Sequence, residues 1–198
     1  LQLNPRLRGL LIQLPLPAHI AADAVLAHIK PEIDVDCLTE ENIRLLYNGT
    51  PRFIPPTAAA ILELLKATGE DLSLKNILVV GQGKLVGKPI TALLKQQNLS
   101  VFIADQNTPN TSDLLQNADI VISGTGRQGI ITADTVKSGA IVVDAGTAEM
   151  NGGIVGDIDF KSVSPKTSFI SPVPGGVGPV TVTKLLENLL RASDRSTS

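Results

Sequence analysis

The chain has 198 residues, 43% of them hydrophobic and 18% charged, and its mean hydropathy of +0.21 indicates a globular chain holding one domain or two small ones. A net charge of −2, one Tyr, four Phe and no Trp provide neither a basic field nor stacking platforms, which argues against a nucleic-acid partner. The single cysteine excludes an internal disulfide, as expected in a reducing cytoplasm, and no apolar run approaches membrane-spanning length.

Residues 9–14 are a short apolar run before Pro15, which predicts a buried parallel strand. Gln13 lies near its C-terminal end, the edge at which open α/β sheets bind ligands. A strand-end glutamine that bonds a neighbouring loop is the alternative, and spacing alone favours it. Residues 20–29 then have helical periodicity, with an inward face formed by Ala24, Val25, Leu26 and Ile29. Neither histidine has a partner at metal-ligand spacing, so no metal site is predicted.

An acidic loop follows at residues 31–37. Alternation puts Asp34 and Asp36 on the same side of an extended backbone. The two carboxylates could hold a cation or a polar ring, or they could serve only as turn and cap residues.

Two helices are expected next. The first runs from Thr39, its predicted N-cap, to Tyr47. Residues 52–57 are rigid and extended because of their prolines. The second helix covers residues 58–68, with Gly69 as a C-cap, and we interpret this stretch as a domain junction.

The apolar run 77–80 stops at a turn containing Gly81, Gly83 and Gly87, and a helix with Pro89 near its start follows. Glycines allow positive φ and close approach of a phosphate, and the free N–H groups of the helix N-terminus attract an anion. The spacing departs by one residue from the dinucleotide fingerprint. Taken alone, it indicates a plain strand-to-helix turn more strongly than a pyrophosphate site.

A second apolar strand is predicted at 101–104 and ends at Asp105. An acid at this position binds the ribose 2′-hydroxyl in nicotinamide-dinucleotide proteins. A turn-forming role before Asn107 and Pro109 has equal weight. Asp105 therefore raises the odds of a dinucleotide site without establishing one.

Further apolar strands at 120–122 and 140–143 alternate with helical or polar segments, which predicts βαβ units and an α/β fold with a parallel sheet. The small residues 123–126 and 144–147 follow these strands. A cofactor lying across the carboxyl edge needs backbone access there, whereas ordinary turn chemistry is the alternative.

Three prolines and three glycines within residues 172–181 exclude a helix or a central strand and predict a fixed, irregular path. A closing helix with an apolar stripe follows from Val182 to Leu190, and residues 191–198 form a polar tail.

Several motifs occur in the order and register of one family, namely Gln-Leu-Pro-Leu-Pro at 13–17, Asp-Val-Asp at 34–36, the glycine turn at 81–89, Gly-Asp at 156–157 and the Pro/Gly block at 172–179. The chain resembles the bifunctional methylenetetrahydrofolate dehydrogenase/cyclohydrolases over residues 7–192. The Pro-Gly-Gly-Val-Gly-Pro block is the most specific marker.

The resemblance implies a Rossmann-like NAD(P)-binding domain at 58–177 and part of an α/β folate domain at 1–57, completed by a helix at 178–198. Folate lies between the two domains in the family. Hydride passes from the methylene carbon of methylenetetrahydrofolate to the nicotinamide, and water then converts the methenyl product to formyltetrahydrofolate. A homodimer through the nucleotide domain and a place in one-carbon metabolism and purine biosynthesis are also implied.

The resemblance assigns roles residue by residue. Gln13 orients the catalytic lysine and the substrate, and Asp36 hydrogen-bonds the pterin ring. The loop that shapes the folate pocket is Pro174, Gly175, Gly176, Val177, Gly178 and Pro179. The residues that hold the dinucleotide are Gly81, Gln82, Gly83, Val86, Gly87, Asp105, Thr125, Gly126, Gly146 and Thr147.

Some departures bear on activity. The family's catalytic lysine and tyrosine lie in an N-terminal segment with no counterpart here, and a start at Leu1 rather than Met leads us to expect further sequence upstream. Cys37 stands where the family has glycine, and Pro56 where it usually has cysteine. These changes keep a second hypothesis open, a non-catalytic homologue that only binds nucleotide or folate.

Other departures bear on the cofactor, which is NADP or NAD. Gln82 stands where the family has an arginine suited to the 2′-phosphate of NADP, and Asp105 replaces a histidine and would repel that phosphate. The sequence therefore favours NAD over NADP.

Overall fold

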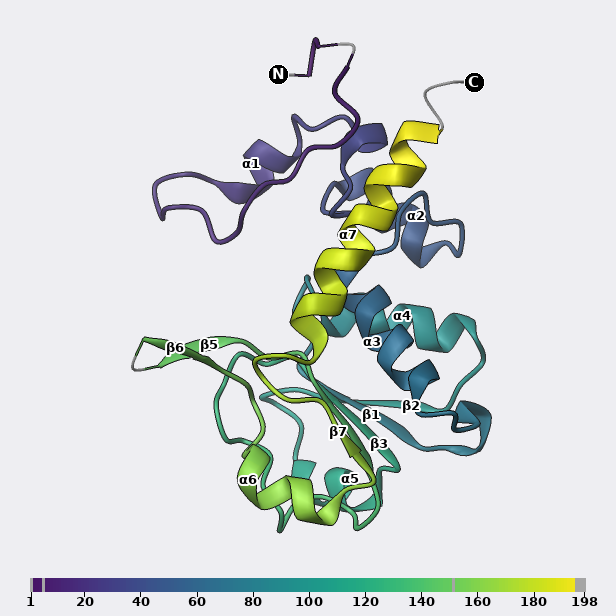
Figure 1. Ribbon diagram of the computed structural model, residues 1–198, viewed down its shortest axis with the longest axis vertical. Helices are drawn as coiled ribbons and strands as arrows, with labels where there is room; N and C mark the ends of the chain where they lie inside the picture. The colour runs from purple at the N-terminus through teal and green to yellow at the C-terminus, as the bar shows by residue number, and fades with distance from the viewer. Residues whose placement is uncertain (1, 5, 151, 195–198) are drawn as a thin grey trace. The chain divides into compact units, whose positions relative to one another are not determined.

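The structure is a computed structural model that describes residues 2–4, 6–150 and 152–194 (Figure 1). The chain divides into two compact units, Leu1–Pro56 with Val182–Ser198, and Thr57–Thr181. The sequence placed these boundaries after residues 57 and 177. Residues 195–198 of the predicted C-terminal helix and polar tail lie outside the described residues.

The larger unit is built on a parallel sheet. Its strands are β1 (Ile77–Val80), β2 (Val101–Ala104), β3 (Ile120–Ser123), β4 (Ile141–Asp144) and β7 (Phe169–Ile170), in the order β2-β1-β3-β4-β7. β1, β3 and β4 are buried at every position, as expected of strands covered on both faces. The predicted α/β fold with a parallel sheet is confirmed.

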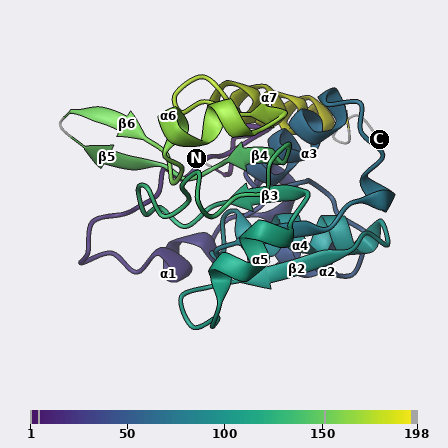
Figure 2. The same cartoon turned by 90° about the horizontal axis from the view of Figure 1, so that it is seen from below.

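Helices cover both faces of this sheet. They are α3 (Pro56–Ala67), α4 (Gly87–Gln96), α5 (Thr111–Asn117) and α6 (Phe160–Val163), with short 3-10 turns at Leu72–Leu74 and Ser164–Lys166. Figures 1 and 2 show α3 and α4 on one face and α5 and α6 on the other. Alternate strand residues such as Leu78, Val121 and Val142 pack with Leu115 of α5 and Val163 of α6.

The strand register fixes where the site can form. Val80 pairs with Ala104 on one side and with Ser123 on the other, and Ser123 pairs with Asp144. Four carboxyl ends are therefore level, and the segments that follow them emerge at one edge of the sheet.

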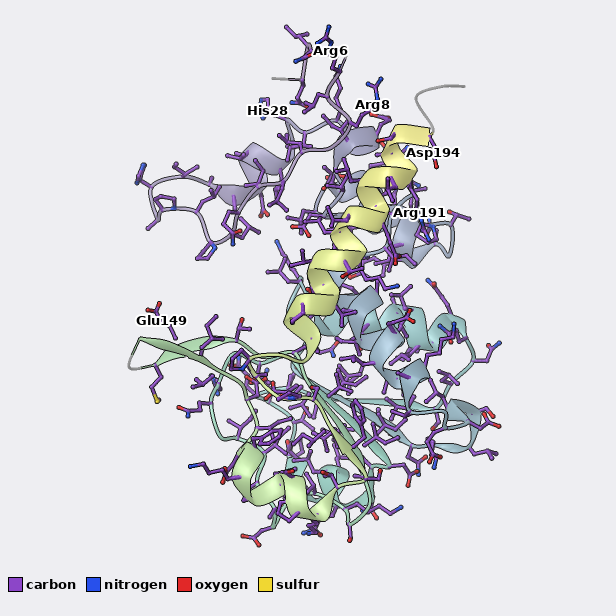
Figure 3. All side chains as sticks on the ribbon, in the orientation of Figure 1. Arg6, Arg8, His28, Glu149, Arg191 and Asp194 are labelled. Atoms are coloured by element: carbon purple, nitrogen blue, oxygen red, sulfur yellow. The ribbon has the colours of Figure 1, made fainter. Side chains whose placement is uncertain are left out.

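An antiparallel hairpin follows β4, with strands β5 (Ala148–Met150) and β6 (Gly153–Val155). It extends away from the main sheet, and Glu149 projects from it (Figure 3). This hairpin was not predicted from the sequence, because its exposed residues lack apolar alternation.

The smaller unit contains α1 (Ala22–Leu26), a 3-10 turn (Pro31–Ile33), α2 (Glu40–Tyr47) and most of α7 (Val177–Asp194). Its core joins Val35, Cys37 and Phe53 to Ala192 of α7. The buried Asn188 side chain donates to the carbonyls of Val35 and Ile54, both at 2.8 Å, and so satisfies two loop carbonyls of this unit.

The predicted strand at residues 9–14 is wrong. Only Leu10 forms a bridge, with Asp34, and the Leu10 N–H donates to the Ile33 carbonyl at 2.7 Å. A strand needs a neighbour along its length, and Pro15 and Pro17 cannot donate to one. Leu11 is accordingly 45% exposed instead of buried.

Two helix predictions also need correction. The helix expected at 20–29 is shorter than predicted and consists of α1 alone. It ends early because the following residues form tight turns, such as the bond from the His28 N–H to the Val25 carbonyl at 3.1 Å. No residue of α1 is buried. The prolines and glycines predicted an irregular path through residue 181, but residues 177–181 form the first turn of α7, in agreement with the helix that the resemblance implies from residue 178. Pro179 is tolerated there because N–H groups of the first turn have no intrahelical acceptor.

The predictions for the neighbouring helices hold. The Thr39 hydroxyl accepts from the Asn42 N–H at 3.4 Å at the start of α2, as an N-cap should. Gly69 follows α3 with φ +73°, the left-handed conformation of a glycine C-cap. Within the described ranges, no helix combines the length and apolarity needed to cross a bilayer.

Candidate functional site

The glycine-rich turn between β1 and α4 is packed so tightly that two of its glycines cannot be replaced. Gly81 has φ +91°, and a Cβ there would lie 2.8 Å from the Gly124 carbonyl oxygen. A Cβ on Gly87 would overlap the Gly81 carbonyl. These glycines bring the turn against the end of β3 and the helix against the strand.

Gly83 differs from its neighbours. A Cβ built on Gly83 meets nothing within 4 Å, and its φ is not positive. No packing within the described chain therefore requires glycine at this position. In dinucleotide sites the second glycine of the turn gives a pyrophosphate access to the backbone, and the open space at Gly83 fits that role.

Gln82 and Val86 complete the turn. The Gln82 amide donates to the Gly81 carbonyl at 2.9 Å and to the Thr91 hydroxyl of α4 at 3.3 Å, and these bonds stabilise the turn against the helix. Val86 packs toward Gly124, where a Cβ would come within 2.7 Å of a Val86 methyl group. Val86 thus supports the turn and does not line the cavity beside it.

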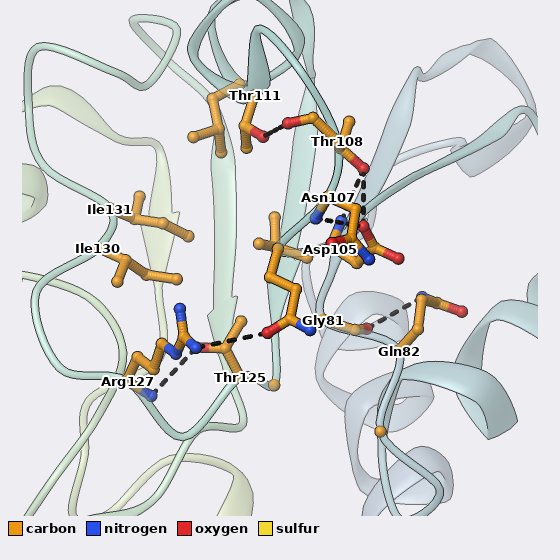
Figure 4. Close-up of a pocket in the computed structure, with 15 residues that line it drawn as sticks. Gly81, Gln82, Asp105, Asn107, Thr108, Thr111, Thr125, Arg127, Ile130 and Ile131 are labelled. Atoms are coloured by element: carbon orange, nitrogen blue, oxygen red, sulfur yellow. Dashed lines mark hydrogen bonds between the residues drawn. The ribbon is translucent and has the colours of Figure 1, made fainter.

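A cavity of about 540 Å³ opens beside this turn at the carboxyl edge of the sheet (Figure 4). Of the predicted dinucleotide residues, the structure brings together Gly81, Gln82, Gly83, Asp105 and Thr125 along its wall. Val86, Gly87, Gly126, Gly146 and Thr147 do not line it.

Asp105 combines the two roles that the sequence left open. It follows β2 and lines the cavity, while its Oδ1 accepts from the Asn107 N–H at 2.8 Å and from the Thr108 hydroxyl at 3.2 Å. Its other oxygen, Oδ2, makes no hydrogen bond within the described part of the chain. Asp105 is thus a turn residue that still presents a free acceptor to the cavity.

Arg127 lines the opposite side of the cavity and was missed by the sequence analysis. Its backbone N–H donates to the Thr125 hydroxyl at 3.1 Å, and its guanidinium reaches Gln106 at 3.5 Å (Figure 4). A charged residue directly after the turn of the third strand was the available signal. The cavity therefore holds both an acid and a cation.

The turns after β3 and β4 lie close together beyond this cavity. A Cβ on Gly126 would come within 3.9 Å of the Thr147 carbonyl oxygen. Both turns are held by buried carboxylates: Asp157 accepts from the Thr125 N–H at 2.6 Å, and Asp144 accepts from the Gly146 N–H at 3.0 Å. Burial raises the pKa of Asp144 to about 6, against the opposing effect of its backbone donors.

The two acids of the loop after residue 31 have different environments. Asp34 is 2% exposed and accepts from the backbone of Leu38 and Thr39, the Thr39 hydroxyl and the Asn42 amide at 2.7–3.1 Å. Asp36 makes no hydrogen bond within the described residues. Burial, and secondarily the charge of Asp34, raises the pKa of Asp36 to about 6. Asp34 thus has the cap role, and Asp36 remains available to a ligand.

Gln13 and the Pro/Gly loop are largely exposed. Among the described residues, Gln13 donates only to the carbonyl of its neighbour Leu14, at 3.0 Å. In the loop, Pro174, Gly175, Gly178 and Pro179 are exposed, whereas Gly176 and Val177 are buried. A Cβ on Gly176 would approach the Pro172 carbonyl oxygen to 2.5 Å, so this glycine fixes the path of the loop.

Within the part of the chain that the structure describes, no group of three His, Cys, Asp or Glu side chains could hold a metal ion. Cys37 is buried, and its thiol donates to the Phe53 carbonyl at 3.4 Å. Burial is the main cause that raises the pKa of this thiol to about 12, which keeps it unreactive.

Comparison with known proteins agrees with this geometry. The family described as "Tetrahydrofolate dehydrogenase/cyclohydrolase, NAD(P)-binding domain" matches residues 55–197. The bifunctional protein FolD of Lactobacillus delbrueckii subsp. bulgaricus is 45% identical over 195 residues, which are 98% of this chain and 69% of that protein. FolD of Bacillus subtilis is 42% identical over 98% of this chain and 69% of its own length.

Solved structures give the same result. The bifunctional FolD enzyme of Campylobacter jejuni matches with a TM-score of 0.89 and 40% identity, covering 95% of this chain and 68% of that one. The Trypanosoma brucei enzyme, complexed with NADP cofactor and inhibitor, matches with a TM-score of 0.90 and 38% identity over 96% and 68%. From its sheet, its glycine turn and these relatives, the chain belongs to the tetrahydrofolate dehydrogenase/cyclohydrolase family.

Proposed function

We propose that this chain acts in the NAD(P)-dependent oxidation of methylenetetrahydrofolate and the hydrolysis of the methenyl product to formyltetrahydrofolate. The observation that carries the proposal is the cavity at the carboxyl edge, where Gly83 leaves backbone access beside the tightly packed Gly81 and Gly87. Relatives 45% identical over 98% of the chain are bifunctional enzymes by name, which favours catalysis over a non-catalytic binding homologue.

The nucleotide part of the mechanism is orientation. The glycine turn and the N-terminus of α4 would hold the pyrophosphate, and Asp105 would accept from a ribose hydroxyl through its free oxygen. The dinucleotide supplies the acceptor for hydride. Hydride transfer requires near-contact distance between donor and acceptor, so a turn that fixes the cofactor supplies part of the rate enhancement.

The folate part rests on Asp36 and Gln13, which belong to the same unit. An Asp36 carboxylate without a hydrogen-bond partner in the described chain is suited to accept two donors from a planar pterin ring. These two hydrogen bonds from the pterin ring would lower the Asp36 pKa toward its ordinary value and fix the orientation of the ring. Gln13, which is exposed, supplies a further contact to tetrahydrofolate.

The cofactor is NAD in preference to NADP. The Gln82 amide donates its hydrogen bonds within the protein, to Gly81 and Thr91. The Asp105 carboxylate lines the cavity and would repel the 2′-phosphate of NADP. Arg127 acts in the opposite direction, because a guanidinium in the same cavity can pair with a phosphate. The Trypanosoma brucei relative was solved with NADP.

Isothermal titration of the chain with NAD and with NADP tests both proposals. We expect one site per chain and several-fold tighter binding of NAD. Asp105→Asn should raise the affinity for NADP about tenfold and leave NAD within roughly threefold, since it removes one charge near the phosphate. Asp134→Asn, an exposed acid outside the cavity, is the matched control. Absence of binding contradicts the function, and a several-fold preference for NADP contradicts only the cofactor assignment.

We propose that the chain works in the cytoplasm and serves one-carbon metabolism and purine biosynthesis.

We also propose that it forms a homodimer through the nucleotide-binding unit. The dimer is supported by β2, an edge strand of the sheet on which Phe102 is 49% exposed and Ile103 is 37% exposed. An unpaired strand edge with apolar side chains is a template for a second copy.

A further inference from the structure

Two buried carboxylates join the turns after β3 and β4. Asp144 ends β4 and is 3% exposed, and Asp157 follows β6 and is 1% exposed. We propose that Asp157 is a positioning residue for the dinucleotide: its carboxylate holds the Thr125 turn in the conformation that lines the cavity. The inference rests on the proposed function, because it concerns the same cavity.

The contacts of Asp157 are few and specific. Its Oδ2 accepts from the Ser123 hydroxyl at 2.7 Å and from the Thr125 backbone N–H at 2.6 Å. Both donors belong to the turn where β3 ends, and Thr125 lines the cavity. These two bonds fix the Thr125 end of the turn, while the backbone holds its start, where the Gly124 N–H donates to the Val80 carbonyl at 3.0 Å.

Asp144 holds Asp157 in place. Its Oδ1 accepts from the backbone N–H groups of Asp157 and Gly146 at 3.1 and 3.0 Å, and its Oδ2 accepts from that of Ile158 at 3.0 Å. The Asp144 N–H in turn donates to the Ser171 hydroxyl at 2.8 Å. Asp144 thus fixes the backbone around Asp157, and Asp157 transmits that position to Thr125.

Two glycines make room for these carboxylates. A Cβ on Gly146 would overlap the Asp157 carboxylate, and a Cβ on Gly156 would overlap that of Asp144. The backbone at both positions is shaped around the acids. This explains why a Gly-Asp pair at 156–157 and a glycine in the 144–147 turn occur together.

The role is positional, and the β3 core does not depend on it. Ile120, Val121 and Ile122 are buried and pair with β1 and β4 without the Asp157 side chain. Loss of the carboxylate frees the Thr125 N–H and lets the turn move, while the strands stay paired. We therefore expect a loss of dinucleotide affinity that exceeds the loss of stability.

The test compares dinucleotide affinity, thermal unfolding and the amide proton resonance of Thr125 in several variants of the chain. Asp157→Ala should weaken dinucleotide binding about 5- to 50-fold and remove the downfield shift expected for an amide bonded to a carboxylate. Asp157→Asn keeps an acceptor oxygen and should restore affinity to within roughly threefold. Ser123→Ala removes the other donor, leaves the Thr125 bond and should bind nearly as the parent does.

Gly146→Ala gives an independent route, because its new methyl group displaces the same carboxylate. It should reproduce the loss of affinity. Gly153→Ala should not, because a Cβ on this hairpin glycine makes only an ordinary contact, 3.7 Å from the Met150 carbonyl oxygen. If Asp157→Ala does not fold, the dinucleotide affinities of Asp157→Asn and Gly146→Ala are compared instead, and only Gly146→Ala should bind more weakly than the parent. A parent chain that binds neither NAD nor NADP overturns the proposed function and this inference with it. A parent that binds, with affinity unchanged when the Thr125 bond is lost, overturns the positioning role alone.

Discussion

Asp34 and Asp36 are two residues apart, yet only one has its carboxylate satisfied by the protein. Asp34 accepts from four groups, so its charge helps to build the loop. Asp36 is partly buried and meets the like charge of Asp34 instead of a donor. A charge kept without a partner costs stability and is available to a ligand, which is the pattern of a binding residue.

This cost can be measured as a pH dependence of stability. Because the pKa of Asp36 is raised from 3.8 to about 6, the folded state holds its proton more tightly than the unfolded state. The contribution of Asp36 to the free energy of unfolding is then fully present below about pH 4 and is lost as pH rises through about 6. Asp36→Asn should stabilise the protein by about 1–2 kcal/mol at about pH 7.5, after allowance for partial exposure, and by nothing near pH 4.

Urea unfolding of Asp36→Asn and the parent at the two pH values tests this prediction. Asp113→Asn, an exposed acid of α5, serves as the control and should change stability little at either pH. An Asp36→Asn variant less stable than the parent at about pH 7.5 would show that the carboxylate has a partner in solution.

Elements were predictable where local chemistry decides them. The strands at 77–80 and 101–104 and the cap at Thr39 follow from side-chain type and spacing. The run at 9–14 is also mostly apolar but forms one bridge, since a strand forms only where a neighbour exists. The charge of Arg127 and the Gly-Asp motif at 156–157 are visible in the sequence. The roles of these residues are not, because they depend on contacts across the sheet edge.

Within the glycine turn, the structure separates two kinds of glycine that share one motif. Gly87→Ala would place a methyl group on the Gly81 carbonyl, so the turn must open, at a cost on the order of 2 kcal/mol. Gly83→Ala meets no atom and should change stability by less than about 0.5 kcal/mol. The new methyl group at Gly83 nevertheless occupies the space in which a phosphate approaches the backbone.

Thermal unfolding and NAD titration of both variants should therefore diverge. Gly87→Ala lowers the unfolding temperature by several degrees, whereas Gly83→Ala keeps the temperature and loses about tenfold or more in affinity. Equal NAD affinity of Gly83→Ala and the parent would mean that no phosphate binds against the backbone at Gly83, and the cavity would then have another role.

At the scale of the whole molecule, the two edges of the main sheet differ. β7 is two residues long, and both are partly buried, whereas β2 presents four residues with Phe102 and Ile103 exposed. Soluble proteins usually protect an edge of this kind with charge, proline or a covering element, and β2 contains neither charge nor proline. A second copy of the chain would pair this edge by extending the sheet across a two-fold axis.

Light scattering coupled to size exclusion tests the dimer. We expect a mass near twice the 20.8 kDa of the chain, falling toward one chain when Phe102→Lys places a charge on the β2 edge. Phe160→Lys is the matched control, since Phe160 of α6 is 42% exposed and lies away from that edge, and it should leave the mass unchanged. A parent chain that stays monomeric as its concentration rises, or a dimer that survives Phe102→Lys, would place the interface elsewhere. Asp105 directly follows β2, the edge strand of the proposed interface. Loss of the dimer should therefore weaken NAD binding only if β2 needs the second copy of the chain to hold Asp105 in place.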